Sequence, residues 1–288
     1  MRGWFVRGGK SRIRALVLGL ALAAMLGLAA CRPPELPIQS DRQSSSQAGK
    51  GSGSPSAGAE EAEESFSWDR VPAYDGSAFA VMHKNRPYFS REEIRDWSGQ
   101  SFTQLDALGR CGVARAKITP ELMPTERRGE IGSVKPSGWH TVKYADSIQD
   151  RYLYNRCHLI GYQLTGQNAN PKNLITGTRY MNASVMEPFE SLVASYVKKT
   201  GKSVAYRVTP VFVGSELVAR GVLMEAYSDA DQGESICYCV FCYNMQPGIS
   251  INYGDGSSQP DGNYHLSDGT YFSRGFIIPK INTGSYKN

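Results

Sequence analysis

The sequence lacks the signatures of several large hydrolase classes. It has no Gly-x-Ser-x-Gly nucleophile elbow and no phosphate-binding P-loop. It has four histidines in 288 residues, and they do not cluster with aspartates as the ligands of a two-metal hydrolase do. We also find no internal repeat. These absences argue against a serine hydrolase, a P-loop nucleotide hydrolase and a two-metal phosphatase or phosphodiesterase of small molecules.

The apolar run near the start is too short to span a bilayer comfortably, which takes about 20 residues. It extends from Ala15 to Ala30 and follows five basic residues and no acidic ones. This pattern is typical of an export signal. The run ends in Leu28-Ala29-Ala30-Cys31, which resembles a bacterial lipobox. We therefore expect residues 1–30 to be a lipoprotein signal peptide and lipidated Cys31 to anchor the protein on the outer side of the cell membrane. An ordinary secretory signal with a chance cysteine is the alternative.

Neither sign of charge is in large excess. The net charge is +5. Residues 1–31 carry five basic and no acidic residues, and residues 32–64 carry three basic and six acidic residues, so residues 65–288 have a net charge of +3. Such a charge is ordinary for a domain, so a case for nucleic-acid binding must depend on specific residues. Residues 31–64 have no hydrophobic periodicity and are rich in Pro, Ser and Gly, which predicts a flexible tether.

A folded domain is predicted from residue 65 to 254, with a tail of unassigned role at 255–288. Ser90 and Glu93 form a capping-box pattern that predicts a helix start. A second helix is predicted through Val185 and Tyr196, with Pro188 in its first turn and Gly201 after its end. Strands are predicted at 139–144, 152–160, 204–208, parts of 217–227, 236–243 and 271–278. This order favours an α+β fold with a mixed or antiparallel sheet.

Five cysteines remain after Cys31. Because five is odd, at least one is free even if disulfides form outside the cytoplasm. Three of them form Cys-x-Cys-x-x-Cys in an apolar strand, a spacing unlike that of structural zinc sites. We interpret the five as core or disulfide residues, and they are Cys111, Cys157, Cys237, Cys239 and Cys242.

The segment from Asn155 to Glu190 carries residues suited to phosphodiester hydrolysis. A neutral histidine such as His158 can take a proton from water at pH 7. A hard cation such as Mg²⁺ can stabilise the leaving oxygen, and an asparagine carbonyl such as that of Asn182 can be its single protein ligand. Arginine suits the charge of the phosphoryl group, and Arg156 and Arg179 lie in this segment.

This segment resembles the DNA/RNA non-specific endonucleases, whose ββα-metal site is shared more loosely with the HNH nucleases. It is most similar to secreted and surface DNases of Gram-positive bacteria, such as streptodornases and DNA-entry nucleases. The family signature is Asp-Arg-Gly-His, then Asn-x-x-Thr, then an Asn nine residues after the first Asn and a Glu eight residues further on. Six positions of this chain match it, over a likeness that extends from about residue 108 to 253: Arg156, His158, Asn173, Thr176, Asn182 and Glu190.

The resemblance implies a role for each matched residue. His158 is the expected general base, and Asn182 is the expected single ligand of Mg²⁺ or Mn²⁺. Glu190 is expected to act in catalysis by holding metal-bound waters, and Arg156 to contact phosphate or brace the site. Asn173 is placed with the substrate-binding residues, where it would shape the loop beside the metal ligand.

Two positions depart from the signature, because Asn155 replaces its Asp and Cys157 replaces its Gly. The first change removes a charge and the second adds a side chain beside the base, which leaves a weakened or inactive enzyme open. On a continuous helix, Asn182 and Glu190 are separated by roughly 12 Å along the axis. Both cannot ligate one ion directly, so either Glu190 acts through water or the chain bends before Pro188.

The sequence therefore predicts a metal-dependent endonuclease without sequence preference that acts outside the cytoplasm. Its expected partners are DNA, with RNA left open, and the membrane through Cys31. Arg179 is a further candidate for contact with the substrate. The alternative is a surface lipoprotein that binds nucleic acid but has lost turnover. No protein partner can be inferred.

Overall fold

The computed structural model describes residues 65–145, 148 and 151–261. The predicted signal peptide, the tether, Cys31 and the predicted strand at 271–278 lie outside the described residues. Within this part of the chain, no helix is both long and apolar enough to cross a membrane.

A six-stranded sheet forms the centre of the fold, and every neighbouring pair of its strands is antiparallel. The predicted α+β class is confirmed. In spatial order the strands are β1 (Phe79–Val81), β8 (Cys237–Tyr243), β7 (Gly221–Tyr227), β6 (Val204–Val211), β3 (Ala114–Ile118) and β2 (Gln100–Phe102).

Side chains alternate between the two faces of this sheet, as a period of two requires. On β8, Tyr238, Val240 and Cys242 join the largest hydrophobic core cluster. The intervening Cys239 and Phe241 join a second cluster on the opposite face. Both faces are therefore buried, which explains why the central strands are almost continuously apolar.

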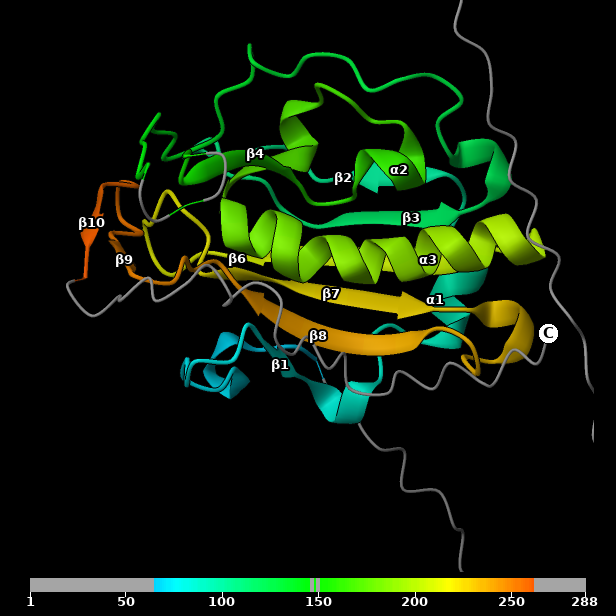
Figure 1. The fold of residues 1–288 in the computed structure, drawn as a ribbon. Coiled ribbons are helices and arrows are strands. Elements are labelled where there is room, and N and C mark those ends of the chain that lie inside the picture. Colours follow the sequence, from blue (N-terminus) through cyan, green and yellow to red (C-terminus); the bar gives the residue numbers. More distant parts are fainter. Residues whose placement is uncertain (1–64, 146–147, 149–150, 262–288) are drawn as a thin grey trace, which may run out of the picture. The chain divides into compact units, whose positions relative to one another are not determined.

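Helix α3 (Glu187–Thr200) covers one face, as Figure 1 shows. Its apolar side is fully buried, including Phe189 and Val193. Pro188 lies in its first turn, and Gly201 ends it with φ of 68°, a conformation that glycine adopts without steric cost. The helix that the sequence predicted is confirmed.

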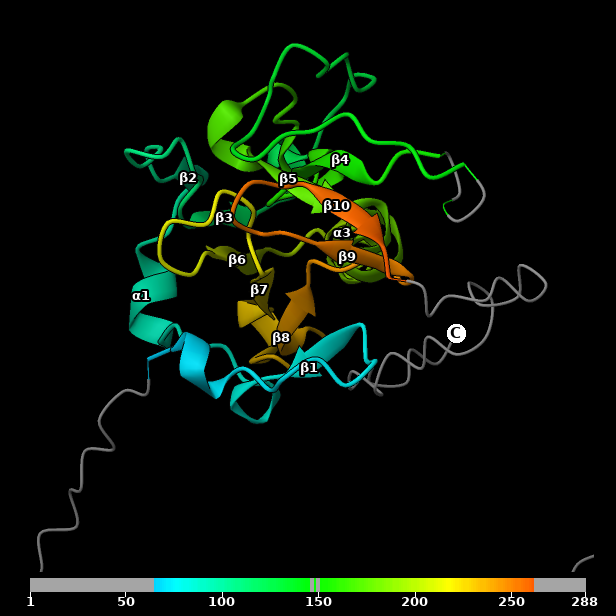
Figure 2. The ribbon, with the colours of Figure 1, turned by 90° about the vertical axis from the view of Figure 1, so that its left-hand side faces the viewer.

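The N-terminal part of the described chain covers the other face (Figure 2). It includes α1 (Arg91–Arg95), where Ser90 and Glu93 form the predicted capping box. Phe89, Ile94 and Trp97 pack against this face of the sheet. Short helices here and elsewhere are η1 (Trp68–Arg70), η2 (His83–Asn85), η3 (Pro120–Leu122), η4 (Pro171–Asn173) and η6 (Asp229–Asp231).

A hairpin and a helix form a separate unit on the α3 side of the sheet. Strands β4 (Tyr154–His158) and β5 (Leu174–Thr178) pair antiparallel, and the short helix α2 (Tyr162–Thr165) lies in the connection between them. A π-helix, η5 (Met181–Met186), then leads directly into α3. Two strands followed by a helix are the ββα arrangement that the sequence predicted.

The predicted strand at 139–144 is wrong, because this segment forms only one isolated bridge, between Lys143 and Tyr152. Its side chains bond instead to the segment that follows β9 (Ile249–Ile251) and leads into β10 (Ser258–Pro260). The Tyr144 hydroxyl lies 2.9 Å from Ser258 Oγ, and His140 Nε2 lies 2.9 Å from the carbonyl of Asp255. Residues 255–261, which the sequence placed in the tail, thus bond to the domain and pair with β9.

Candidate active site

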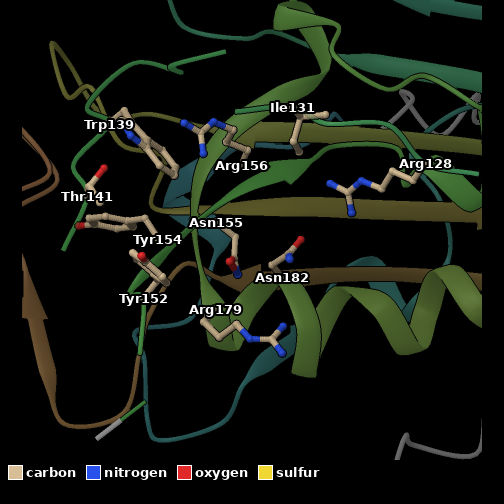
Figure 3. Close-up of a pocket in the computed structure, with 10 residues that line it drawn as sticks. All are labelled: Arg128, Ile131, Trp139, Thr141, Tyr152, Tyr154, Asn155, Arg156, Arg179 and Asn182. Carbon is tan, nitrogen blue, oxygen red and sulfur yellow. The ribbon is translucent and has the colours of Figure 1, made fainter. Parts of the chain in front are cut away.

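One pocket of about 570 Å³ gathers several residues that the sequence predicted for the site. Figure 3 shows Arg156, Arg179 and Asn182 converging on it from β4, the end of β5 and η5. No acidic side chain lines it. The complete lining is Arg128, Ile131, Trp139, Thr141, Tyr152, Tyr154, Asn155, Arg156, Arg179 and Asn182.

Two carboxamides lie side by side in the middle of this pocket (Figure 3). Asn182 extends from the π-helix, and Asn155 extends from β4. Neither side chain makes a hydrogen bond to another described residue. Their oxygens are therefore available to a ligand in the pocket.

Arg156 braces the pocket wall. Its Nε donates to the carbonyl of Val134 at 2.5 Å, and its Nη2 donates to that of Gly132 at 2.8 Å. Its guanidinium also lies over the ring of Trp139, 4.1 Å from the ring centroid. These contacts hold the side chain of Arg156 against the segment that contains Gly132 and Val134. Only the remaining Nη1 is not engaged in these contacts.

His158, the last residue of β4, is 6% exposed and does not line the pocket. Its Nε2 lies 2.8 Å from the carbonyl of Asn168, and its Nδ1 lies 3.4 Å from Nη2 of Arg128. Because a carbonyl only accepts hydrogen bonds, the neutral ring carries its proton on Nε2 and its lone pair on Nδ1. Burial lowers the pKa of His158 to about 4, and the Arg128 charge acts in the same direction. The ring is therefore neutral at pH 7, as a general base requires.

Arg128 connects His158 to the pocket, and the sequence analysis missed it. It lies in a segment without regular secondary structure, 30 residues before His158, and no helical or strand pattern points to it. Its guanidinium reaches both the pocket and the imidazole. In the sequence, Arg128 is one of two adjacent arginines after Glu126, and nothing distinguishes it from Arg127.

Glu190 lies away from the pocket, on the buried side of α3. It is 8% exposed, and its Oε1 accepts a hydrogen bond of 2.9 Å from the backbone N–H of Gly161. Burial raises the pKa of Glu190 to about 8, against the opposing effect of the Gly161 hydrogen bond. The carboxyl is thus mostly protonated at pH 7 in this structure.

Asn173 cannot contact substrate directly, so its placement among the substrate-binding residues was wrong. It is fully buried, and its carboxamide donates to the Ile160 carbonyl and accepts from the Ile160 N–H, both at 2.9 Å. The side chain thereby fixes the chain just beyond His158. Thr176 has a similar structural role, since its hydroxyl donates to the carbonyl of Ser137 at 2.8 Å.

Two buried amides anchor the hairpin to the large sheet, and the sequence gave no sign of them. The Nδ2 of Asn244, which follows β8, donates to the carbonyls of Thr176 and Ala219, and its Oδ1 accepts from the Thr178 N–H. Gln246 accepts from the N–H of Tyr180 at 3.1 Å. These bonds hold β5 and the start of η5, and with them Asn182, in place relative to the large sheet.

The five cysteines of the described chain are free thiols, and four of them are buried. Of the two predicted alternatives, core residues or disulfides, the first is confirmed for the four buried cysteines, while Cys237 is half-buried. Cys157 faces away from His158, as neighbours on a strand do, and its Sγ lies 3.5 Å from the sulfur of Met186. Burial raises the pKa of this thiol well above its usual value. The side chain that replaces the signature's glycine therefore does not crowd the base.

The donor atoms in the pocket fit a hard, hydrated cation. The described residues contain no cluster of three or more His, Cys, Asp or Glu side chains that could enclose a metal. Two neutral amide oxygens in an open pocket instead suit an ion such as Mg²⁺, which keeps several of its waters and takes few protein ligands. A soft metal that requires thiolates or several imidazoles does not fit.

The chain is similar in sequence to known nucleases. Residues 91–230 match the sequence model of the family described as DNA/RNA non-specific endonuclease. A deoxyribonuclease from Streptococcus dysgalactiae subsp. equisimilis is 34% identical over 111 residues, which are 36% of this chain and 32% of that protein. The match thus spans about a third of the relative's length.

Two solved structures are similar in fold. NucA from Streptococcus agalactiae, solved with magnesium bound, superposes with a TM-score of 0.57 and 24% identity, covering 64% of this chain and 89% of NucA. The Sda1 nuclease, solved with a bound zinc ion, gives a TM-score of 0.52 and 24% identity, covering 63% of this chain and 96% of Sda1.

Proposed function

We propose that the chain is a metal-dependent endonuclease without sequence preference, and that it belongs to the DNA/RNA non-specific endonuclease family, whose sequence model residues 91–230 match. Its proposed substrate is DNA, with RNA as a second candidate. One observation carries this proposal: a single pocket combines three arginines with Asn182, and its Arg128 contacts a neutral, buried His158.

The arginines bind the phosphate of the scissile bond. Arg128 and Arg179 line different parts of the pocket (Figure 3), and their charges suit the negative charge that grows on the phosphoryl oxygens in the transition state. Arg156 holds the wall formed by Gly132 and Val134 in place. Contacts of this kind are made to the phosphate backbone and not to the bases, which accounts for the proposed absence of sequence preference.

His158 takes the proton of the attacking water at Nδ1. The carbonyl of Asn168 holds the other ring nitrogen and so fixes the tautomer. Because Nη2 of Arg128 lies 3.4 Å from Nδ1, a water can reach the lone pair only when Arg128 turns toward the phosphate. Substrate binding by Arg128 thus exposes the base.

Asn182 holds the cation in this proposal, and Asn155 is its neighbour in the pocket. When bound, Mg²⁺ or Mn²⁺ stabilises the charge on the leaving oxygen. Glu190 supports the site at a distance by fixing Gly161, three residues after the base.

The location and domain boundaries are part of the same proposal. Residues 1–30 direct export, Cys31 carries the lipid, and residues 31–64 tether an endonuclease domain that starts at residue 65. The support for this is the basic start, the short apolar run and the small residues before Cys31. A lipid anchor would hold the enzyme at the outer face of the membrane.

Plasmid cleavage tests the proposal. We would incubate the detergent-solubilised full chain with supercoiled plasmid, with Mg²⁺ or with EDTA, beside the His158→Ala variant. His83→Ala is a matched control, because His83 stacks on Tyr88 and does not line the pocket. Metal-dependent cutting by the parent and His83→Ala but not by His158→Ala is expected. Plasmid that is bound in a gel shift but never cut would favour the inactive binding protein instead.

A further inference from the structure

The pocket has an aromatic end in addition to its cationic one. Figure 3 shows Trp139, Tyr152 and Tyr154 together at one end, Arg128 at the other, and the two carboxamides between them. Phosphate binding and metal binding account for the arginines and the amides. They do not account for the faces of three aromatic rings, because a phosphate can bond only to the hydroxyl or N–H at the edge of such a ring.

The aromatic end is held rigidly. Tyr154 is 3% exposed, and its hydroxyl donates to the carbonyl of Gly256 at 3.0 Å. Arg156 covers Trp139 and is itself bonded to two backbone carbonyls. Tyr152 belongs to the only bridge of its segment, opposite Lys143. Tyr154 and Trp139 are therefore in place before any ligand binds, and the backbone of Tyr152 is held beside them.

Tyr152 is the ring that a ligand can reach. It is 42% exposed, whereas Tyr154 is buried and Arg156 lies over Trp139. Lys143 lies over this ring, with Nζ 4.9 Å from the centroid. An accessible ring next to a groove lined with cations is the arrangement by which proteins bind single-stranded nucleic acids, since each base can stack on the ring while its phosphate meets the cations.

We propose that Tyr152 stacks on a nucleobase adjacent to the scissile phosphate, so that the enzyme prefers strands with unpaired bases to intact duplex. The inference rests on the proposed nuclease function and names its substrate class. In a duplex each base is paired and stacked inside the helix, and it reaches a protein ring only after it is extruded at an energetic cost. In a single strand that cost is absent.

This stacking is compatible with cutting at any sequence. Every base has a π-face, so stacking discriminates little between bases. It discriminates between base-paired and unpaired nucleotides, a distinction that the arginines cannot make because both forms present the same phosphates. Tyr152 would therefore determine strand preference, and the arginines would set overall affinity.

Cleavage of matched substrates tests the proposal. We would measure kcat/KM of the full chain in Mg²⁺ on a labelled single strand and on the same strand annealed to its complement. Tyr152→Ala should lower the ratio of the single-strand to the duplex value by about tenfold, as expected for the loss of one stacked base. Tyr152→Phe, which keeps the ring, should preserve the ratio. Tyr74→Ala should preserve it too, because Tyr74 is 47% exposed but lies outside the pocket.

Binding in EDTA gives a second readout that does not depend on turnover. Tyr152→Ala should weaken binding of the single strand by about tenfold and leave binding of a fully abasic strand, which has phosphates but no bases, unchanged. Equal losses on both strands, or an unchanged cleavage ratio in Tyr152→Ala, would overturn the stacking role. If the parent cuts neither substrate, the nuclease proposal fails, and the comparison with the abasic strand still decides whether Tyr152 stacks on bases.

Discussion

Glu190→Gln is expected to stabilise the fold near neutral pH and to lower nuclease activity. Glutamine has the same shape and can still accept the hydrogen bond from Gly161. It removes a carboxyl whose pKa is raised from 4.5 to about 8 by burial. A group with a raised pKa contributes its full stability below the unfolded value and loses it as the pH rises to the folded value. The parent should therefore lose stability between pH 4.5 and 8, and the variant should not.

The size of the effect follows from the two pKa values. Each pH unit within that window costs about 1.4 kcal/mol, so the parent should lose about 3 kcal/mol relative to Glu190→Gln between about pH 5 and 7.5. His158 contributes an opposite slope, since its pKa is lowered to about 4 and protonation below pH 6.5 destabilises the fold. That slope is common to both proteins and cancels in the comparison.

Urea unfolding in EDTA, followed by tryptophan fluorescence at the two pH values, measures this difference. A gap of about 3 kcal/mol corresponds to a shift of about 1 M in the urea midpoint. Glu187→Gln is the matched control, because Glu187 is exposed on the same helix. Parallel pH dependences in the parent and Glu190→Gln would refute the burial argument. Activity in Mg²⁺ should fall about tenfold or more, as for loss of a residue that supports a metal site.

Four further substitutions test other parts of the site and its anchor. His158→Ala should fold and lose at least about a hundredfold in rate, as for loss of a general base, and full activity would remove His158 from that role. Asn182→Ala should raise the Mg²⁺ concentration needed for half-maximal cutting, which a metal titration measures, and an unchanged requirement would exclude it as the ligand. Asn155→Asp should lower that concentration, because it adds a negative charge beside Asn182, and a higher requirement would contradict the charge argument. Cys31→Ser should move the protein from the membrane to the soluble fraction of fractionated cells, whereas retention on membranes would mean that Cys31 is not the anchor.

Elements that depend on local patterns could be predicted from the sequence. The capping box at Ser90, the end of α3 at Gly201 and the apolar strands β6 to β8 all follow from neighbouring residues. The strand predicted at 139–144 failed because its alternating side chains contact residues 255–258, and its backbone pairing is limited to the isolated bridge between Lys143 and Tyr152. The π-helix at 181–186 could not be foreseen, since its wider hydrogen-bond spacing leaves no distinct periodicity over one turn.

Some residues of the candidate site could also be predicted from local spacing, and others could not. Spacing along the chain placed Arg156, Arg179 and Asn182 in one pocket, because the hairpin and the helix that follows it are continuous in sequence. Arg128 arrives from a distant irregular segment, and only the tertiary structure shows it beside His158. Asn173 matched the motif, but a motif does not distinguish a side chain that contacts a ligand from one that holds the backbone.

Electrostatics explains how the pocket can work with asparagine where the family signature has aspartate. Its lining contains three arginines and no acidic residue, so it attracts a phosphate and repels a free cation. The phosphate brings the negative charge that the cation needs, and the cation in turn strengthens phosphate binding, because coupling between two ligands is reciprocal. With Asn155 in place of the signature's aspartate, cation binding depends more strongly on a bound phosphate. His158 and Asn182 still match the signature. The substitution should therefore weaken metal binding to the free protein far more than it weakens catalysis in the presence of nucleic acid.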